Sequence, residues 1–426
     1  MVASFWSLKS LYLRYTTLGL GLLFILFQAT AGSDFEIFLA ASVDLLHHTN
    51  IYGGFYKTCY HYYYSPLFAL ALFPLTFINL YLAKLIWLAL NLVFVFRTWK
   101  ALSFFLDRTL FSEKQKLSFT LISFLFVLYF LIENFHCGQM TLFIFFLASD
   151  GIYRIMTGRY WLGGLFLSLA INIKLLPLVL LPYLFYRRYF KALAWSVGFL
   201  ALWLYLPAVV IGNDFNNLLL HNWWALINPH NAEHVIDTAE RSFHGLSSLL
   251  PALLMDHVND PHVLHIKRNI ANLNAANIEI ILNVIRLFLI LFSLFFFRTK
   301  PFKRAPNKLH AFREISYLFL LVPLIFPHQQ HYAFYFMFPA CSYMCYYLAM
   351  HFISRENTIS RRKKQILVTG MAIIFLTNNL QFLLGQFGQY YIHFKIITYG
   401  ALLLIPLIAI ATPEEIPLRK DETDRI

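Results

Sequence analysis

The stretch WLGGLFLSLAINIKLLPLVLLPYLFYRR, residues 161–188, decides the class of fold. It is apolar almost throughout, is interrupted by Lys174 and ends in two arginines. Pro177 disfavours helix in the residue before it, so we expect two short helices with a break near Lys174. Similar apolar runs recur along the chain of 426 residues, of which 59% are hydrophobic and 13% charged. A soluble domain is about half apolar and a quarter charged, so the sequence indicates an all-α integral membrane protein.

The basic residues orient these apolar runs, because Lys and Arg accumulate in cytoplasmic loops. Most of the 34 Lys and Arg cluster near one set of helix ends, which explains the formal net charge of +13 without nucleic acid as a partner. About half of the 21 acidic residues and most of the 16 histidines fall on the opposite side. We therefore expect a multi-pass protein of the cell (inner) membrane, with cytoplasmic termini and an active site on the non-cytoplasmic side.

The apolar runs predict about twelve transmembrane helices, since a span needs about 20 residues and fewer where broken helices are buried in protein. They form a single polytopic domain over 1–411, with a first external loop at 32–65, a long external segment at 212–277 and a cytoplasmic tail at 412–426. The expected spans are roughly 12–31, 80–98, 117–132, 140–157, 160–174, 176–187, 192–211, 278–297, 312–327, 332–352, 366–385 and 392–411.

Residues 62–80 are apolar enough to insert, but as a full span they would invert the charge pattern that follows. We therefore expect an in-plane or half-inserted helix that begins near Pro66, because proline is tolerated in the first turn of a helix.

The polar side chains of the outer face lie in the loop 32–65, which begins with the segment that carries Asp34 and Glu36, and in ENFHCGQ (133–139), 212–277 and PHQQHY (327–332). Acids at a membrane boundary are costly to hold near hydrocarbon, so Asp34 and Glu36 are the first candidates for chemistry. A carboxylate can accept a proton from a hydroxyl, and cations can stabilise a departing phosphate. The outer face therefore suits an enzyme that acts on a lipid-linked anionic substrate.

These side chains also have structural interpretations. Asp34 could cap a helix, and Lys174 could be an interfacial lysine whose ammonium reaches water. A metal pair of Asp34 and Glu36 is disfavoured because i,i+2 side chains diverge on a helix, and a zinc site at His328 and His331 lacks further ligands. No phosphate-cradling glycine loop is present, so a cytosolic nucleotide site is unsupported. We expect no metal and no cofactor.

A series of motifs follows the first-loop acid in a characteristic order. They are NIYGGFY (50–56), YHYYYSPLFALALFPL (60–75), HCGQMTLFIFFLA (136–148), LSLAINIKLLPLVLLPYLFYRR (167–188), ERSFHGLSSLL (240–250) and PLIFPHQQHYAFYFMFPA (323–340). In this order and spacing the chain resembles glycosyltransferase family 87 over roughly 30–345. That family consists of GT-C-type multi-span enzymes and includes polyprenyl-phosphate-mannose-dependent mannosyltransferases.

The resemblance implies an inverting transfer of a hexose, with mannose as the first candidate, from a polyprenyl-phosphate carrier to a lipid- or glycan-linked hydroxyl. It implies a GT-C-like helical bundle, and partners limited to the bilayer, the lipid-linked donor and the glycan or glycolipid acceptor. Asp34 would be the catalytic base. The donor phosphate would be bound by Lys174, Arg241, His328 and His331, and the substrate site would be lined by Glu36, Tyr52, Tyr64, Gln139, Ser242 and His244.

Some positions depart from the family pattern. Met140 and Thr141 follow the GQ pair where asparagine is usual, and Arg241 stands where a neutral amide is commoner. These departures concern the sugar and the acceptor more than the class of enzyme. The alternative function is a lipid-linked sugar flippase or secondary transporter, which should carry polar residues near the bilayer midplane and often contains internal repeats. A protein that only binds polyprenyl-linked substrates is a second alternative.

Overall fold

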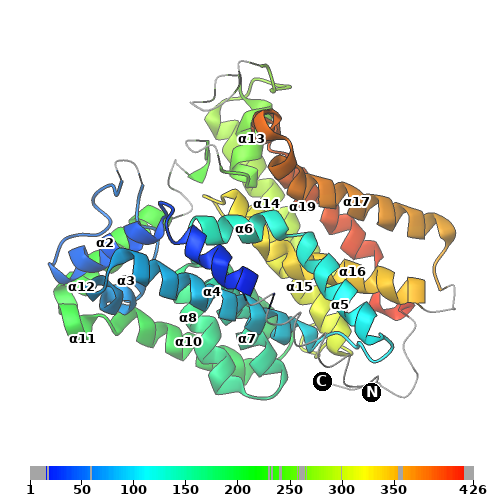
Figure 1. Ribbon diagram of the computed structural model, residues 1–426, viewed down its shortest axis with the longest axis horizontal. Helices are drawn as coiled ribbons and strands as arrows, with labels where there is room; N and C mark the ends of the chain where they lie inside the picture. Colours follow the sequence, from blue (N-terminus) through cyan, green and yellow to red (C-terminus); the bar gives the residue numbers. More distant parts are fainter. Residues whose placement is uncertain are drawn as a thin grey trace.

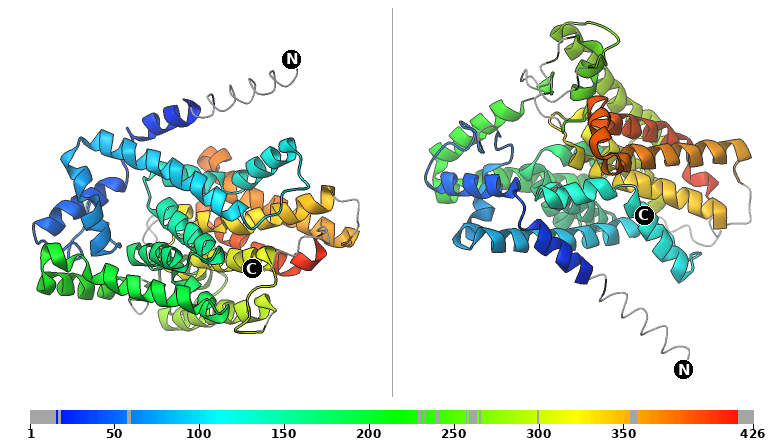
Figure 2. Two further views of the ribbon diagram at one scale, coloured as in Figure 1. Left: turned by 90° about the horizontal axis from the view of Figure 1, so that it is seen from below. Right: turned by 45° about the horizontal axis from the view of Figure 1, so that its top comes forward.

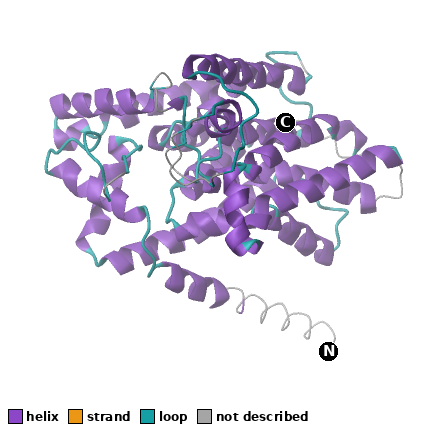
Figure 3. Ribbon diagram, turned by 90° about the horizontal axis from the view of Figure 1, so that it is seen from above, coloured by secondary structure: helices purple, strands orange, loops and turns teal. Residues whose placement is uncertain are grey.

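The computed structural model describes residues 16, 19–57, 60–228, 231, 234–238, 242–256, 258, 264, 266–298, 300–353 and 358–416. Within these residues every regular element is a helix, and β-type pairing is limited to isolated bridges between Tyr56 and Tyr60 and between Phe243 and Gln330. Figure 3 shows the helices and the loops that join them. The prediction of an all-α protein is confirmed.

Helices make up most of the described chain. Its first part contains α2 (Phe35–Leu46), α3 (Pro66–Leu72), η1 (Phe73–Phe77), α4 (Leu80–Ser103), α5 (Glu113–Leu125), α6 (Leu128–His136), α7 (Thr141–Met156), α8 (Tyr160–Ile173), η2 (Leu176–Val179), α9 (Leu180–Tyr186) and α10 (Phe190–Tyr205). The remainder contains α11 (Ala208–Ile211), α12 (Asn213–Ile227), α13 (Leu246–Leu254), α14 (Ala275–Phe297), α15 (Lys308–Ile325), η4 (His331–Met337), α16 (Phe338–Ile353), α17 (Arg361–Leu383), η5 (Gly385–Phe387), α18 (Gly388–His393), α19 (Ile396–Ile410) and η6 (Pro413–Glu415).

Among the described residues, three helical stretches are long and apolar enough to cross a membrane: Leu80–Ser103, Phe190–Ile211 and Ala275–Phe297. The number rises to five if two bent pairs each form one span, with bends of 63° between α5 and α6 and 107° between α17 and α18. The predicted count of about twelve is therefore not confirmed. Many of the other apolar helices are short, and at about 1.5 Å per residue α8 and α9 each cover less than a hydrocarbon core of about 30 Å.

Proline sets two helix boundaries as the sequence predicts. Pro66 lies in the first turn of α3, where the Ser65 side chain caps the helix. Together α3 and η1 make a short apolar element over Pro66–Phe77. Helix α8 ends at Ile173, Lys174 is extended (φ −153°, ψ 132°), and Pro177 lies in the following 3₁₀ turn.

Helix α8 packs against α7 and α10 through glycines. A Cβ atom added to Gly163 would lie 2.5 Å from Ile155 Cγ1, and one added to Gly164 would lie 2.7 Å from Trp195 Cβ. Small residues of this kind let helix backbones approach closely inside membranes. The three helices therefore form one tightly packed unit, and Lys174 directly follows its central helix.

Helix α15 is buried along most of its length and runs through the core. Near its N-terminal end, the buried carboxylate of Glu314 pairs with Arg187, whose Nε donates to Glu314 Oε2 at 2.9 Å. The Tyr183 hydroxyl donates to the same carboxylate at 3.1 Å. Near the other end, residues 326–331 lead into η4. Helices α2 and α3 lie beside α12 at one side of the molecule in Figures 1 and 2.

Candidate active site

Asp34 stands at the N-cap position of α2, but its side chain makes no capping hydrogen bond. Its carboxylate instead accepts a hydrogen bond from the side-chain amide of Gln139, in the turn between α6 and α7. The Asp34 backbone N–H donates to the carbonyl of Cys137 in the same turn, at 3.0 Å. Asp34 therefore has the predicted N-cap position but does not cap α2 by a side-chain hydrogen bond, and its carboxylate is directed at the GQ motif.

Tyr64 joins this pair from the segment that leads into α3. Its hydroxyl donates to Gln139 Oε1 at 3.3 Å, and its carbonyl accepts a hydrogen bond from the Tyr52 hydroxyl at 2.7 Å. The Lys174 ammonium lies over the Tyr64 ring, 5.5 Å from its centroid. The acid, the GQ turn, the tyrosine segment and the helix break thus meet around one aromatic side chain, and we call these residues the Asp34 cluster.

Glu36 has a different role from its neighbour Asp34. Its carboxylate lies 2.6 Å from the Lys84 ammonium and 2.8 Å from the Lys57 ammonium. Desolvation raises the pKa of Glu36, but the hydrogen bonds from Lys57 and Lys84 outweigh it and lower the pKa to about 2. A carboxylate held by two ammonium groups is a poor metal ligand, and one of the two, Lys57, also acts electrostatically on the Asp34 carboxylate.

Asp34 is mostly shielded from water. Burial raises its pKa above the ordinary value of 3.8, the nearby Lys57 charge and the Gln139 hydrogen bond lower it, and the Glu36 charge raises it. Burial therefore dominates, because the net shift is upward. A carboxylate with a raised pKa is a stronger base once ionised, as a group that must take a proton from a hydroxyl requires.

A second cluster surrounds His328, whose backbone is left-handed (φ 52°). His328 Nδ1 lies 2.8 Å from Asp237 Oδ1, and the His328 N–H donates to Asp237 Oδ2 at 2.6 Å. The His234 ring meets the His328 ring edge-on, with centroids 4.7 Å apart. Sequence reasoning did not single out Asp237. The feature that could have indicated Asp237 is its place in the sequence, since it is an acid between two stretches that contain histidines.

The neighbouring His331 lies on another carboxylate, with its Nε2 2.9 Å from Glu133 Oε2. Its backbone N–H donates to the Ser242 carbonyl at 3.0 Å, and the His244 N–H donates to the Gln329 carbonyl at 2.9 Å. Residues 242–244 therefore hold the late histidine turn in place. The His244 ring is buried, and desolvation lowers its pKa well below the ordinary 6.5, so His244 is a neutral group in this site.

Adjacent tyrosines connect the two clusters. The Tyr63 ring packs on the His328 ring, with centroids 5.0 Å apart, while the Tyr64 hydroxyl reaches Gln139. The Trp223 indole N–H donates to the Tyr63 carbonyl at 3.2 Å and fixes this segment against α12.

The segment from the end of α6 to the start of α7 is a further connection. Glu133 lies in α6 and contacts His331, whereas Gln139, just before α7, contacts Asp34. The structure thus gathers the predicted residues Asp34, Gln139, Tyr64 and Lys174 directly, and joins them to the two late histidines through shared neighbours. The predicted Arg241 lies outside the described residues.

Comparison with known families covers part of this site. The family model described as glycosyltransferase family 87 matches residues 62–307, more than half of the chain. The chain belongs to glycosyltransferase family 87. It is therefore a glycosyltransferase, and its apolar helices indicate a membrane protein. The match contains Tyr64, Gln139 and Lys174, whereas Asp34 and the late histidines lie beyond its ends. No significant match was found among curated proteins or solved structures.

Gly138 shapes the turn that presents Gln139 in this glycosyltransferase. Its φ is +61°, and an added Cβ would lie 3.2 Å from Phe35 Cβ. We expect Gly138→Ala to lower the free energy of unfolding by about 1–3 kcal/mol, because left-handed strain and crowding combine. Transfer activity should also fall in this variant. Both effects are measured on the protein in detergent, by a transfer assay and by thermal unfolding. Gly158→Ala is the control, since Gly158 has φ +82° but open space around it. Equal losses of activity in both variants would contradict a role for this turn.

Proposed function

We propose that this enzyme transfers a hexose, with mannose as the first candidate, from a polyprenyl-phosphate donor to a hydroxyl of a lipid- or glycan-linked acceptor. The observation that carries the proposal is the Asp34 cluster. Its carboxylate and its Lys174 ammonium both contact the Tyr64–Gln139 pair, so an acidic and a basic side chain come to one place. Family membership supplies the reaction class.

In the proposed reaction, Asp34 accepts the proton of the acceptor hydroxyl as the hydroxyl oxygen attacks the anomeric carbon. The bond from that carbon to the phosphate oxygen breaks on the opposite face of the sugar, so the anomeric configuration inverts. Lys174 stabilises the negative charge on the departing phosphate. His328 and His331 donate hydrogen bonds to the same phosphate from the second cluster, and Arg241 adds a further positive charge.

The other predicted lining residues support this arrangement. Tyr52 fixes Tyr64 through its hydroxyl, and Glu36 holds two lysines near Asp34. Ser242 and His244 brace the late histidine turn through their backbones. The reaction needs no metal, because cations of the chain can stabilise the phosphate leaving group.

The proposal includes a GT-C-like bundle of about twelve spans with its active site on the non-cytoplasmic side of the inner membrane. The distribution of basic residues supports that orientation. It is further supported by the place of both clusters, Lys174 excepted, in segments 32–65, 133–139, 212–277 and 327–332, which carry few lysines and arginines.

A transfer assay in reconstituted membranes tests the function. The purified enzyme is given polyprenyl-phosphate hexoses and a panel of glycan and glycolipid acceptors, with and without EDTA. We expect a product of inverted anomeric configuration and no effect of EDTA. Use of a nucleotide sugar instead would overturn the proposed donor. Movement of labelled sugar lipid across the bilayer without transfer would support the transporter alternative.

The hydrogen bond from Gln139 predicts a shift in pH dependence. Activity requires ionised Asp34, so it falls as the pH drops through the pKa of that carboxyl. Gln139→Leu removes a hydrogen bond to the charged form and raises this pKa further. A hydrogen bond to a charged group contributes about 1.5–3 kcal/mol, and one pH unit corresponds to about 1.4 kcal/mol. The acid limb of the pH–rate profile should therefore move up by roughly one unit or more.

The control for this variant is Gln365→Leu on the exposed surface of α17. It should leave the pH–rate profile unchanged. An acid limb that stays in place in Gln139→Leu, with activity retained, would show that Asp34 does not titrate in the reaction.

A further inference from the structure

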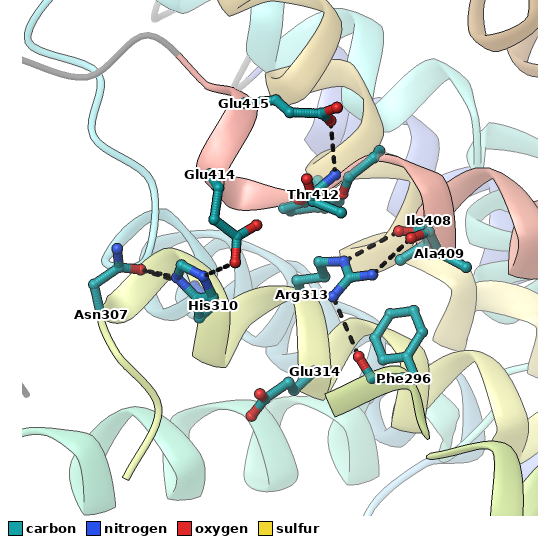
Figure 4. Close-up of polar contacts among 12 residues, drawn as sticks. Phe296, Asn307, His310, Arg313, Glu314, Ile408, Ala409, Thr412, Glu414 and Glu415 are labelled. Carbon is teal, nitrogen blue, oxygen red and sulfur yellow. Dashed lines mark hydrogen bonds and ion pairs between the residues drawn. The ribbon is translucent and has the colours of Figure 1, made fainter. Parts of the chain in front are cut away.

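Helix ends meet at the N-terminal part of α15, far from the late histidine turn. Arg313 of α15 holds them together (Figure 4). Its Nε donates to the Ile408 carbonyl at 3.1 Å and its Nη2 to the Ala409 carbonyl at 2.9 Å, both in the last turn of α19. Its Nη1 donates to the Phe296 carbonyl at the end of α14, at 3.4 Å. One buried guanidinium thus fixes the C-terminal ends of two helices side by side.

A cavity of about 490 Å³ opens at this junction, between the ends of α14 and α19 and the first turn of α17. Its lining combines cations, hydroxyls, one carboxylate and apolar side chains. The residues are Arg298, Ser360, Arg362, Lys363, Ile366, Ile410, Thr412 and Glu415.

The charges of this cavity are only partly neutralised. The Glu415 carboxylate is engaged by the Lys363 ammonium at 2.5 Å and by the Tyr347 hydroxyl at 2.6 Å. Arg298 and Arg362 make no hydrogen bond or ion pair with the described part of the chain. Among the lining residues that the structure describes, three cations and one carboxylate give a net charge of +2. The cavity is therefore suited to an anion.

The remaining lining groups indicate the chemical class of that anion. Guanidinium groups match phosphate oxygens in geometry, and Ser360 and Thr412 add hydroxyls at the start of α17 and the end of α19. The exposed side chains of Ile366 and Ile410 (48% and 39%) form an apolar rim. Along the same face of α17, two turns further on, the side chain of Ile373 is also exposed, and that of Leu376 lies exposed beside it.

We propose that this cavity binds the phosphate group of an anionic membrane phospholipid, with the acyl chains against the exposed surface of α17. Arg298 and Arg362 bind the phosphate, and Ile366 and Ile410 contact the start of the acyl chains. The site lies among the basic clusters at 298–313 and 355–364, and the cytoplasmic leaflet to which such clusters turn is rich in anionic lipid.

This site is separate from the proposed donor site. From Arg313, in the second turn of α15, to Ile325 at the end of the helix the axis rises about 18 Å, and His328 lies just beyond that end. The lipid proposal shares with the proposed function only the orientation of the chain in the membrane, and sugar transfer is not its readout.

Lipid retention tests the proposal. The full-length protein is purified in a neutral detergent, incubated with phosphatidylglycerol or phosphatidylcholine of the same chains, and analysed by native mass spectrometry. We expect the wild-type protein to retain phosphatidylglycerol preferentially. The double variant Arg298→Gln, Arg362→Gln should retain phosphatidylglycerol about tenfold more weakly, because each arginine near a lipid phosphate contributes to the free energy of lipid binding. The control is Lys300→Gln with Arg361→Gln, which removes two neighbouring charges outside the cavity lining.

The other outcomes of this experiment overturn the proposal. If the control variant loses phosphatidylglycerol to the same extent, the lipid is attracted by the positive surface in general and not by this cavity. Displacement of phosphatidylglycerol by an equal concentration of inorganic phosphate would assign the cavity to a free anion. Equal retention of both lipids by the wild-type protein would show that the phosphate site does not select charge. Thermal unfolding of both double variants confirms that each remains folded.

Discussion

Asp34→Asn should reduce the rate of sugar transfer by roughly 100- to 10,000-fold, the contribution usually made by a positioned general base. An asparagine side chain keeps the oxygen that accepts the hydrogen bond from Gln139 but cannot take up a proton at neutral pH. The fold should therefore survive while the chemistry stops. The measurement is single-turnover transfer from the proposed lipid-linked donor, with donor binding measured separately, because binding should change little.

Asp44→Asn is the matched control for this prediction. Asp44 lies on the same helix and accepts a hydrogen bond from the Tyr56 hydroxyl at 2.9 Å, away from Gln139. The Asp44→Asn variant should retain nearly the full rate of sugar transfer. A folded, membrane-inserted Asp34→Asn protein that transfers sugar as fast as Asp44→Asn would rule out Asp34 as the base.

Arg187→Met should have the largest effect on stability, lowering the free energy of unfolding by about 3–5 kcal/mol. The Arg187 and Glu314 side chains are 0% and 3% exposed, so the substitution leaves a buried carboxylate without its cation. It also removes the hydrogen bond from Arg187 Nη1 to the Lys303 carbonyl. Unfolding in a denaturing detergent, followed by circular dichroism, measures the change.

Two further variants decide whether the unpaired charge is the cause. Arg187→Met combined with Glu314→Met should recover most of the lost stability, because apolar side chains of similar size replace both charges. Arg188→Met, an exposed neighbour, should change stability by less than about 0.5 kcal/mol. If the double variant is no more stable than Arg187→Met, lost packing rather than the buried charge accounts for the effect.

The class of fold and its proline-dependent breaks could be predicted from sequence, but the number of spans could not be confirmed. Hydropathy counts apolar residues and does not register where a helix bends. The bend of 63° between α5 and α6 shows why. There the Phe126 carbonyl accepts a hydrogen bond at 2.9 Å from the side-chain amide of Asn378 in α17. A partner so distant in the sequence cannot be assigned from local patterns.

The candidate site, like the fold, could be predicted from the sequence only in part. Motif order pointed to Asp34, Gln139, Tyr64 and Lys174, and the structure brings these side chains together. Motif order did not indicate Asp237, because the segment that carries it has no regular pattern to fix its direction. It also gave no sign that Glu36 would be bound by two lysines. Such ion pairs depend on tertiary packing between the first loop and α4.

The glycine contacts between α7, α8 and α10 have a mechanical consequence for the site. Helices that touch backbone to backbone cannot slide or tilt past one another without collision. Lys174 directly follows α8, the middle helix of the three, so its backbone is attached to a rigid unit. In the proposed reaction, a lipid carrier that diffuses in from the bilayer therefore meets a lysine whose backbone position is fixed.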